Sequence, residues 1–131
     1  MNRSLTLVRA NLVLVALLVL HDLDHVRQGR SIALPVIAVG LVGLLATIGC
    51  LVLAAVGHPL APQVSLLVGV GNVVGFAAIH ILPRWSVLSD PYPDVPVDAI
   101  SWLGLAATMF VAFMVGLIGV NAIRHRQSGV T

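Results

Sequence analysis

The sequence contains no lysine and no glutamate, and only 9% of its 131 residues are charged. A soluble domain carries about 25% charged residues, because its surface must be hydrated. Here 59% of the residues are hydrophobic and the mean hydropathy is +1.06. Because so few polar side chains cannot cover a water-exposed surface, a soluble globular protein is excluded. We expect one all-α domain, residues 1–131, surrounded by a lipid bilayer.

Cysteine is also scarce, and the basic residues form no cluster. Cys50 is the single cysteine and lies inside an apolar run, so an internal disulfide is excluded and a packing role is expected. The net charge of +2 and the pI near 9.5 would suit a nucleic-acid-binding protein. However, the seven arginines are scattered at the ends of apolar segments and make no basic patch. The expected partner is therefore lipid, and no nucleic acid is expected.

Familiar catalytic motifs are missing as well. The sequence shows no serine-nucleophile, P-loop or dinucleotide-binding signature, because its glycines fall inside apolar segments and do not follow strands. It therefore leaves open whether the protein is an enzyme. Abundant alanine and valine, with arginine as the only strong base, are typical of a high-GC bacterial protein.

Four long apolar segments are present, and they predict a polytopic membrane protein with a four-transmembrane-helix bundle. About 20 helical residues cross the roughly 30 Å hydrocarbon core, and lipid offers no water to unpaired backbone groups. Pro83 ends the third segment. Pro96 is expected as the first helical residue of the fourth, with Asp98 in its first turn. The predicted spans are residues 5–25, 32–56, 62–82 and 96–123.

Small residues recur at helix-packing intervals within these segments. Such residues let helix backbones approach closely, which drives association where lipid gives no hydrophobic force. They predict close helix contacts at Gly40, Gly43, Ala46 and Gly49, at Gly71 and Gly75, and at Ala112 and Gly116.

An even number of spans puts both termini on one side of the membrane. Cytoplasmic loops carry an excess of arginine and lysine, so the side with more arginines is expected to be cytoplasmic. This favours a multi-pass protein of the plasma (inner) membrane with both termini in the cytoplasm. The terminal side holds Arg3, Arg9, Arg124 and Arg126, and the other side holds Arg27, Arg30 and Arg84.

The same topology gathers ionisable residues at the extracytoplasmic end. All five aspartates and three of the five histidines fall there. Ionisable groups in or near a membrane are costly and usually functional. The group consists of His21, Asp22, Asp24, His25, His80, Asp90, Asp94 and Asp98.

Within this group, histidine spacing predicts a metal site. His21 and His25 are four residues apart and share one helix face, with Asp24 beside them. His80 falls at a similar depth in the third span. Three imidazoles and a carboxylate suit a divalent transition metal such as zinc, copper or iron. The expected ligands are therefore His21, Asp24, His25 and His80, with Asp22, Asp90, Asp94 and Arg84 as further polar-site residues.

The loop after the third span contributes a second expectation. Its prolines predict a stiff cap that places Asp90 or Asp94 over the histidines. Trp85 and Tyr92, with Trp102, suit the lipid headgroup layer. Asn72, near the middle of the third span, is expected to form an interhelical hydrogen bond.

Several alternatives stay open. A haem could take its axial ligands from His80 and one of His21 and His25, although both positions lie at the bundle rim. The histidines could be an interfacial feature, with the aspartates paired to Arg27 and Arg30. Besides a metal-binding protein, the sequence allows an accessory or assembly subunit of a larger membrane complex, a homo-oligomer, or a small ion- or proton-coupled transporter.

Overall fold

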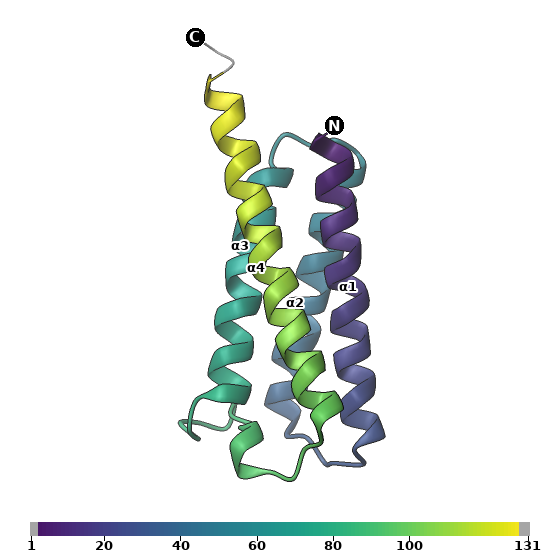
Figure 1. Cartoon of the computed structure of the whole chain (residues 1–131), viewed down its shortest axis with the longest axis vertical. Coiled ribbons are helices and arrows are strands. Elements are labelled where there is room, and N and C mark those ends of the chain that lie inside the picture. Colours follow the sequence, from purple (N-terminus) through teal and green to yellow (C-terminus); the bar gives the residue numbers. More distant parts are fainter. Residues whose placement is uncertain (1–2, 129–131) are drawn as a thin grey trace.

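The protein is a bundle of four long helices (Figure 1). The structure, a computed structural model, describes residues 3–128, and its side chains from residue 5. The described part is all-α and contains no strand. A π turn, η1, prolongs the third helix, and a short 3-10 helix, η2, interrupts the following loop. The elements are α1 (Arg3–Arg27), α2 (Leu34–Ala55), α3 (Ala61–Phe76), η1 (Ala77–Ile81), η2 (Tyr92–Asp94) and α4 (Ala99–Ser128).

These helices confirm the expected membrane-type architecture. Four of them are long and apolar enough to cross a membrane, and their outer faces carry many exposed leucines, valines and isoleucines. The start of α1 and the end of α4 lie at the same end of the bundle, opposite the two loops that follow α1 and η1 (Figure 1). The membrane-compatible segments are Leu5–Arg27, Leu34–Ala55, Ala61–Ile81 and Ala99–Ser128.

The start of the fourth helix differs from the sequence prediction. Pro96 lies in the loop, and α4 begins at Ala99. Asp98 occupies the capping position, where its Oδ1 accepts a hydrogen bond from the backbone N–H of Ser101 at 3.0 Å. An aspartate at this position satisfies an N–H that has no partner within the helix. The side chain of Asp98, and not the ring of Pro96, therefore sets the boundary.

Helix α1 turns one continuous face towards the bundle. Its buried residues are separated alternately by four and three positions, which is the repeat of a single helix face. His21 and His25 are the last two buried positions on this face, at the end of the helix. The buried residues are Leu7, Asn11, Leu14, Leu18, His21 and His25.

Small residues bring α3 and α4 into close contact. A Cβ atom added to Gly69 would lie 2.5 Å from the backbone N of Gly116, and one added to Gly119 would lie 2.7 Å from the carbonyl O of Pro62. The carbonyl O of Ala112 also lies 2.6 Å from the Cβ position of Gly69. The predicted contact at Ala112 and Gly116 is therefore confirmed.

A Cβ atom added to Gly43 would lie 3.7 Å from Asn72 Oδ1, an ordinary contact, but the predicted packing is wrong at four other glycines. A Cβ atom added to Gly40, Gly49, Gly71 or Gly75 would meet no heavy atom within 4 Å among the described residues. Gly71 is two positions after Gly69, so it lies on nearly the opposite side of α3 from the contact with α4. The open side of α3 instead faces a cavity that it shares with α1 and α2.

Asn72 behaves as the sequence predicted. Its side-chain Nδ2 donates to Thr47 Oγ1 on α2 at 3.4 Å and to the Val68 carbonyl at 2.8 Å. This interhelical bond joins α2 to α3 midway along the bundle. A second such bond, from Asn11 Nδ2 to Ser65 Oγ at 3.1 Å, joins α1 to α3.

Candidate metal centre

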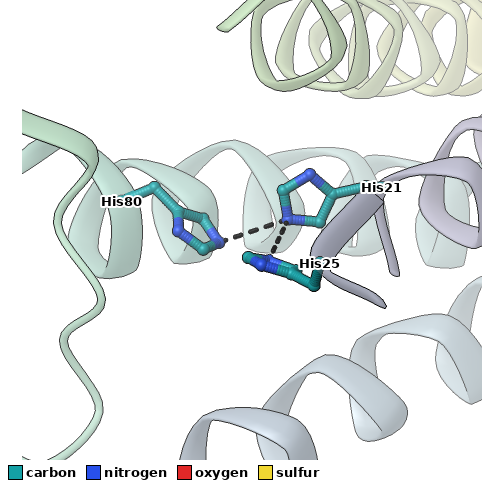
Figure 2. Close-up of side chains that lie close together, drawn as sticks. All are labelled: His21, His25 and His80. Atoms are coloured by element: carbon teal, nitrogen blue, oxygen red, sulfur yellow. Dashed lines mark hydrogen bonds between the residues drawn. The ribbon is translucent and has the colours of Figure 1, made fainter. Parts of the chain in front are cut away.

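Three imidazoles meet at the loop end of the bundle (Figure 2). His21 and His25 come from the last turns of α1, and His80 comes from η1. The Nε2 atom of His21 lies 3.1 Å from Nε2 of His25 and 3.3 Å from Nε2 of His80. All three side chains are buried, and their ligand atoms lie within 4.8 Å of one another.

These separations match the edge of a metal coordination tetrahedron. Two nitrogens bound at about 2.05 Å to one zinc ion, at the tetrahedral angle, lie about 3.3 Å apart. The two Nε2 separations that involve His21 agree with this value to within 0.2 Å. The three ligand atoms as a set lie within 4.8 Å of one another, so small movements of the side chains would bring all three onto one ion.

Hydrogen bonding alone satisfies the three nitrogens poorly. A neutral imidazole nitrogen carries either one proton or one lone pair, so His21 Nε2 can donate at most one hydrogen bond to its two neighbours. The Nδ1 of neutral His80 donates to the backbone carbonyl of Asp90 at 3.1 Å, which leaves a lone pair on its Nε2. Such a carbonyl commonly orients a metal-binding histidine. A cation between the rings would accept all three lone pairs.

The π turn gives His80 its direction. The N–H of Leu82 donates to the carbonyl of Ala77 at 3.0 Å, five residues earlier. Single π turns inside α-helices are rare and are frequent at functional sites. Leu82 then takes an extended conformation (φ −68°, ψ 150°), as expected of a residue before proline, and Pro83 begins the loop. The sequence predicted a regular helix to residue 82, so this change of winding was missed.

Aromatic rings enclose the histidines. The ring centroid of Phe76 lies 4.8 Å from that of His21, and the centroid of Tyr92 lies 4.8 Å from that of His80. Tyr92 is only 1% exposed, so its predicted place in the headgroup layer is wrong. The loop folds back and η2 packs the ring against the histidines. Burial raises the pKa of the Tyr92 phenol to about 12.

No carboxylate joins the three histidines among the described residues. Asp24 was expected as a ligand, but its oxygens accept hydrogen bonds from Arg27 Nε and Gln28 Nε2, each at 2.7 Å. One residue before His25, it is turned about 100° around the helix from the inward face. Asp24 therefore stabilises the end of α1, and its direct ligation is not supported by this geometry.

Asp90 meets the histidines through its backbone. Its carbonyl accepts the hydrogen bond from His80, while its carboxylate pairs with Arg30. The loop is thus a cap over the site, as expected, but it contributes a carbonyl and not a side-chain ligand. Of the remaining residues named from the sequence, Asp94 and Arg84 are exposed in the loop, and Asp22 lines the adjoining cavity.

A charged network holds the end of α1 against the start of α4. The guanidinium of Arg27 binds both oxygens of Asp98, each at 2.9 Å. This guanidinium holds the pKa of the Asp98 carboxyl at about 2. Gln28 Nε2 also donates to Ser101 Oγ at 2.9 Å. These bonds join the end of α1 to the start of α4, although exposed ion pairs add little stability.

No protein-family model, curated protein or solved structure matches the chain. The features that bear on function are the three imidazoles, the carbonyl that orients His80 and the adjoining cavity.

Proposed function

We propose that this is an integral membrane protein that binds one divalent transition metal ion through the Nε2 atoms of His21, His25 and His80. The observation that carries the proposal is the position of His21 Nε2, which lies 3.1 Å from Nε2 of His25 and 3.3 Å from Nε2 of His80, the spacing of ligands around one tetrahedral ion. Zinc fits best, since it accepts three neutral imidazoles at these distances. A haem is disfavoured, because axial histidines must oppose each other across a flat ring.

Three protein ligands leave the fourth tetrahedral position for an exchangeable group. Closed structural zinc sites have four protein ligands, whereas zinc sites that bind substrate or activate water have three. The proposed ion can therefore accept an oxygen ligand from outside the chain. This supports a role in metal-assisted chemistry or ligand binding over a purely structural role.

Metal analysis of detergent-purified protein tests the proposal directly. We expect inductively coupled plasma mass spectrometry to find about one zinc ion per chain. His21→Ala and His80→Ala should each lower this content at least about tenfold. His125→Ala is the matched control, because this exposed histidine lies in the last turn of α4 at the opposite end. A folded wild-type protein without bound metal after incubation with zinc would contradict the proposal.

The same preparations distinguish the other functions. A Soret absorption band would identify haem, and stoichiometric co-purifying chains would favour an accessory subunit. We further propose that the metal site faces away from the cytoplasm in the plasma membrane. The excess of arginine on the side of the termini supports this orientation.

A further inference from the structure

A cavity of about 820 Å³ begins at the three histidines and continues between α1, α2 and α3. Its volume lies in the range of small-molecule sites, about 300–1,000 Å³. Its walls carry ionisable side chains at one end only. Asp22 and Arg30 join the histidines there, whereas aliphatic side chains, glycines, Phe76 and the uncharged amide of Asn72 line the remainder.

Glycines make room for this cavity. Gly40 on α2 and Gly71 and Gly75 on α3 line it, and a Cβ atom on any of them would meet no heavy atom within 4 Å. At 1.5 Å per residue, the lining from Leu67 to His80 extends about 20 Å along the bundle. One leaflet contributes about half of the 30 Å hydrocarbon core. The cavity is therefore long enough to hold the hydrocarbon chain of a lipid from one leaflet.

The charges at its polar end favour an anion. Asp22, Arg30 and the Asp90 carboxylate that Arg30 binds together carry a charge of −1, so a bound divalent ion would leave a net charge of about +1. Arg30 uses one N–H for the Asp90 carboxylate and one for Gln28 Oε1, and a guanidinium has five. N–H groups of Arg30 thus stay available for a carboxylate that enters beside the metal.

We propose that the cavity binds a long-chain carboxylate, a single-chain amphiphile of the fatty-acid type. Its chain lies between α2 and α3, and one carboxylate oxygen takes the fourth position on the metal, near Arg30. The binding of the headgroup rests on the proposed metal site, whereas the binding of the chain rests on the cavity alone. No covalent step is involved.

Photocrosslinking with a hexadecanoic acid that carries a mid-chain diazirine tests the inference. The protein is loaded with zinc in an uncharged detergent, labelled, and mapped by peptide mass spectrometry. We expect labels on the cavity residues of α2 and α3. Gly40→Leu and Gly71→Leu should reduce this labelling about tenfold by filling the cavity. Gly49→Leu is the matched control, because Gly49 also faces open space on α2 but does not line the cavity.

The same probe tests the contact between the carboxylate and the metal. Removal of zinc by a chelator, or the His80→Ala substitution, should reduce cavity labelling, and a hexadecanol probe without a carboxylate should label more weakly than the acid. Equal labelling of the Gly71→Leu and Gly49→Leu proteins would overturn the chain site. Cavity labelling that is blocked by Gly71→Leu but unchanged by chelation would overturn the contact between carboxylate and metal.

Failure of this inference is distinguishable from failure of the proposed function. Stoichiometric zinc without cavity labelling would leave the metal site intact and overturn the amphiphile site. Cavity labelling in a protein that binds no zinc would contradict the metal site, and with it the headgroup contact, while supporting the chain site.

Discussion

Each of the three histidines is held by different neighbours. Nδ1 of His80 has a backbone carbonyl as its partner, and His21 lies edge-on to the Phe76 ring. Nδ1 of His25 is buried and has no hydrogen-bond partner among the described residues. An unpaired buried nitrogen costs free energy, so the position of His25 carries such a cost in the absence of an ion. Contact of its Nε2 with a metal would offset that cost.

The ionisation of the Tyr92 phenol can be followed directly, because Tyr92 is the only tyrosine in the chain. We expect the phenolate absorbance near 295 nm to appear with a midpoint near pH 12 instead of the usual 10. Burial disfavours the charged phenolate, and the unfolded chain therefore loses this proton first. Stability from this group is complete below pH 10 and falls as the pH rises towards 12. Spectrophotometric titration of the folded protein measures the midpoint.

Titration in denaturant supplies the control, since the unfolded chain should show the usual midpoint. Trp102, whose ring contacts Tyr92 edge-on with centroids 5.5 Å apart, offers a second signal of whether the loop stays folded during titration. A midpoint near 10 with unchanged tryptophan fluorescence would show that Tyr92 is accessible to water, contrary to the structure.

At the scale of elements, the glycines of α3 lie on two different faces of the helix. Gly69 packs against the backbone of α4, whereas Gly71 borders the cavity. Gly69→Leu should lower the free energy of unfolding by at least about 1–3 kcal/mol, because its side chain must displace the α4 backbone. Gly71→Leu should stay within about 1 kcal/mol of the wild type, since Leu also favours a helix more than Gly does. Unfolding by titration with a denaturing detergent compares them.

Gly104→Leu on α4 is a useful control for this comparison, because a Cβ atom there meets nothing within 4 Å. Equal destabilisation by the Gly69 and Gly71 substitutions would contradict the assigned faces of α3. It would also remove Gly71→Leu as a probe of the cavity.

The sequence predicted the features that depend on residues close together in the chain and missed those that depend on contacts between distant segments. Apolar length predicted four helices, and the four-residue spacing placed His21 and His25 on one face. Their distance from His80 depends on a π turn, which no spacing rule predicts. Small residues predicted close packing, but a glycine makes room equally for a neighbouring helix or for a cavity. Gly69 and Gly71 could therefore not be distinguished from the sequence. Tyr92 was assigned by residue type, and only the folded loop shows its burial.

For the whole molecule, charge separates along the bundle axis. All five aspartates lie at the histidine end, where Arg27 pairs with Asp24 and Asp98 and Arg30 pairs with Asp90. With Cys50→Ser as background, we expect Val87→Cys to react with a membrane-impermeant maleimide on intact cells. Gln127→Cys should react only after permeabilisation, since the arginine-rich end is expected in the cytoplasm. Gel-shift labelling measures both.

The background substitution is a mild one, because Cys50 Sγ lies 3.2 Å from Ser65 Oγ and a hydroxyl can make the same contact. Val87 and Gln127 are both exposed at opposite ends of the bundle. The reverse labelling pattern would place the histidines on the cytoplasmic side. Their geometry would be unchanged, but the site would then bind metal from the cytoplasm.

Helix α2 has only four buried residues, and three of them, Thr47, Cys50 and Ala54, lie in its second half. Near the histidines only Val36 anchors it. An outward tilt of this first half would therefore break few buried contacts. An amphiphile could then slide in sideways from the surrounding leaflet, without ever passing through water.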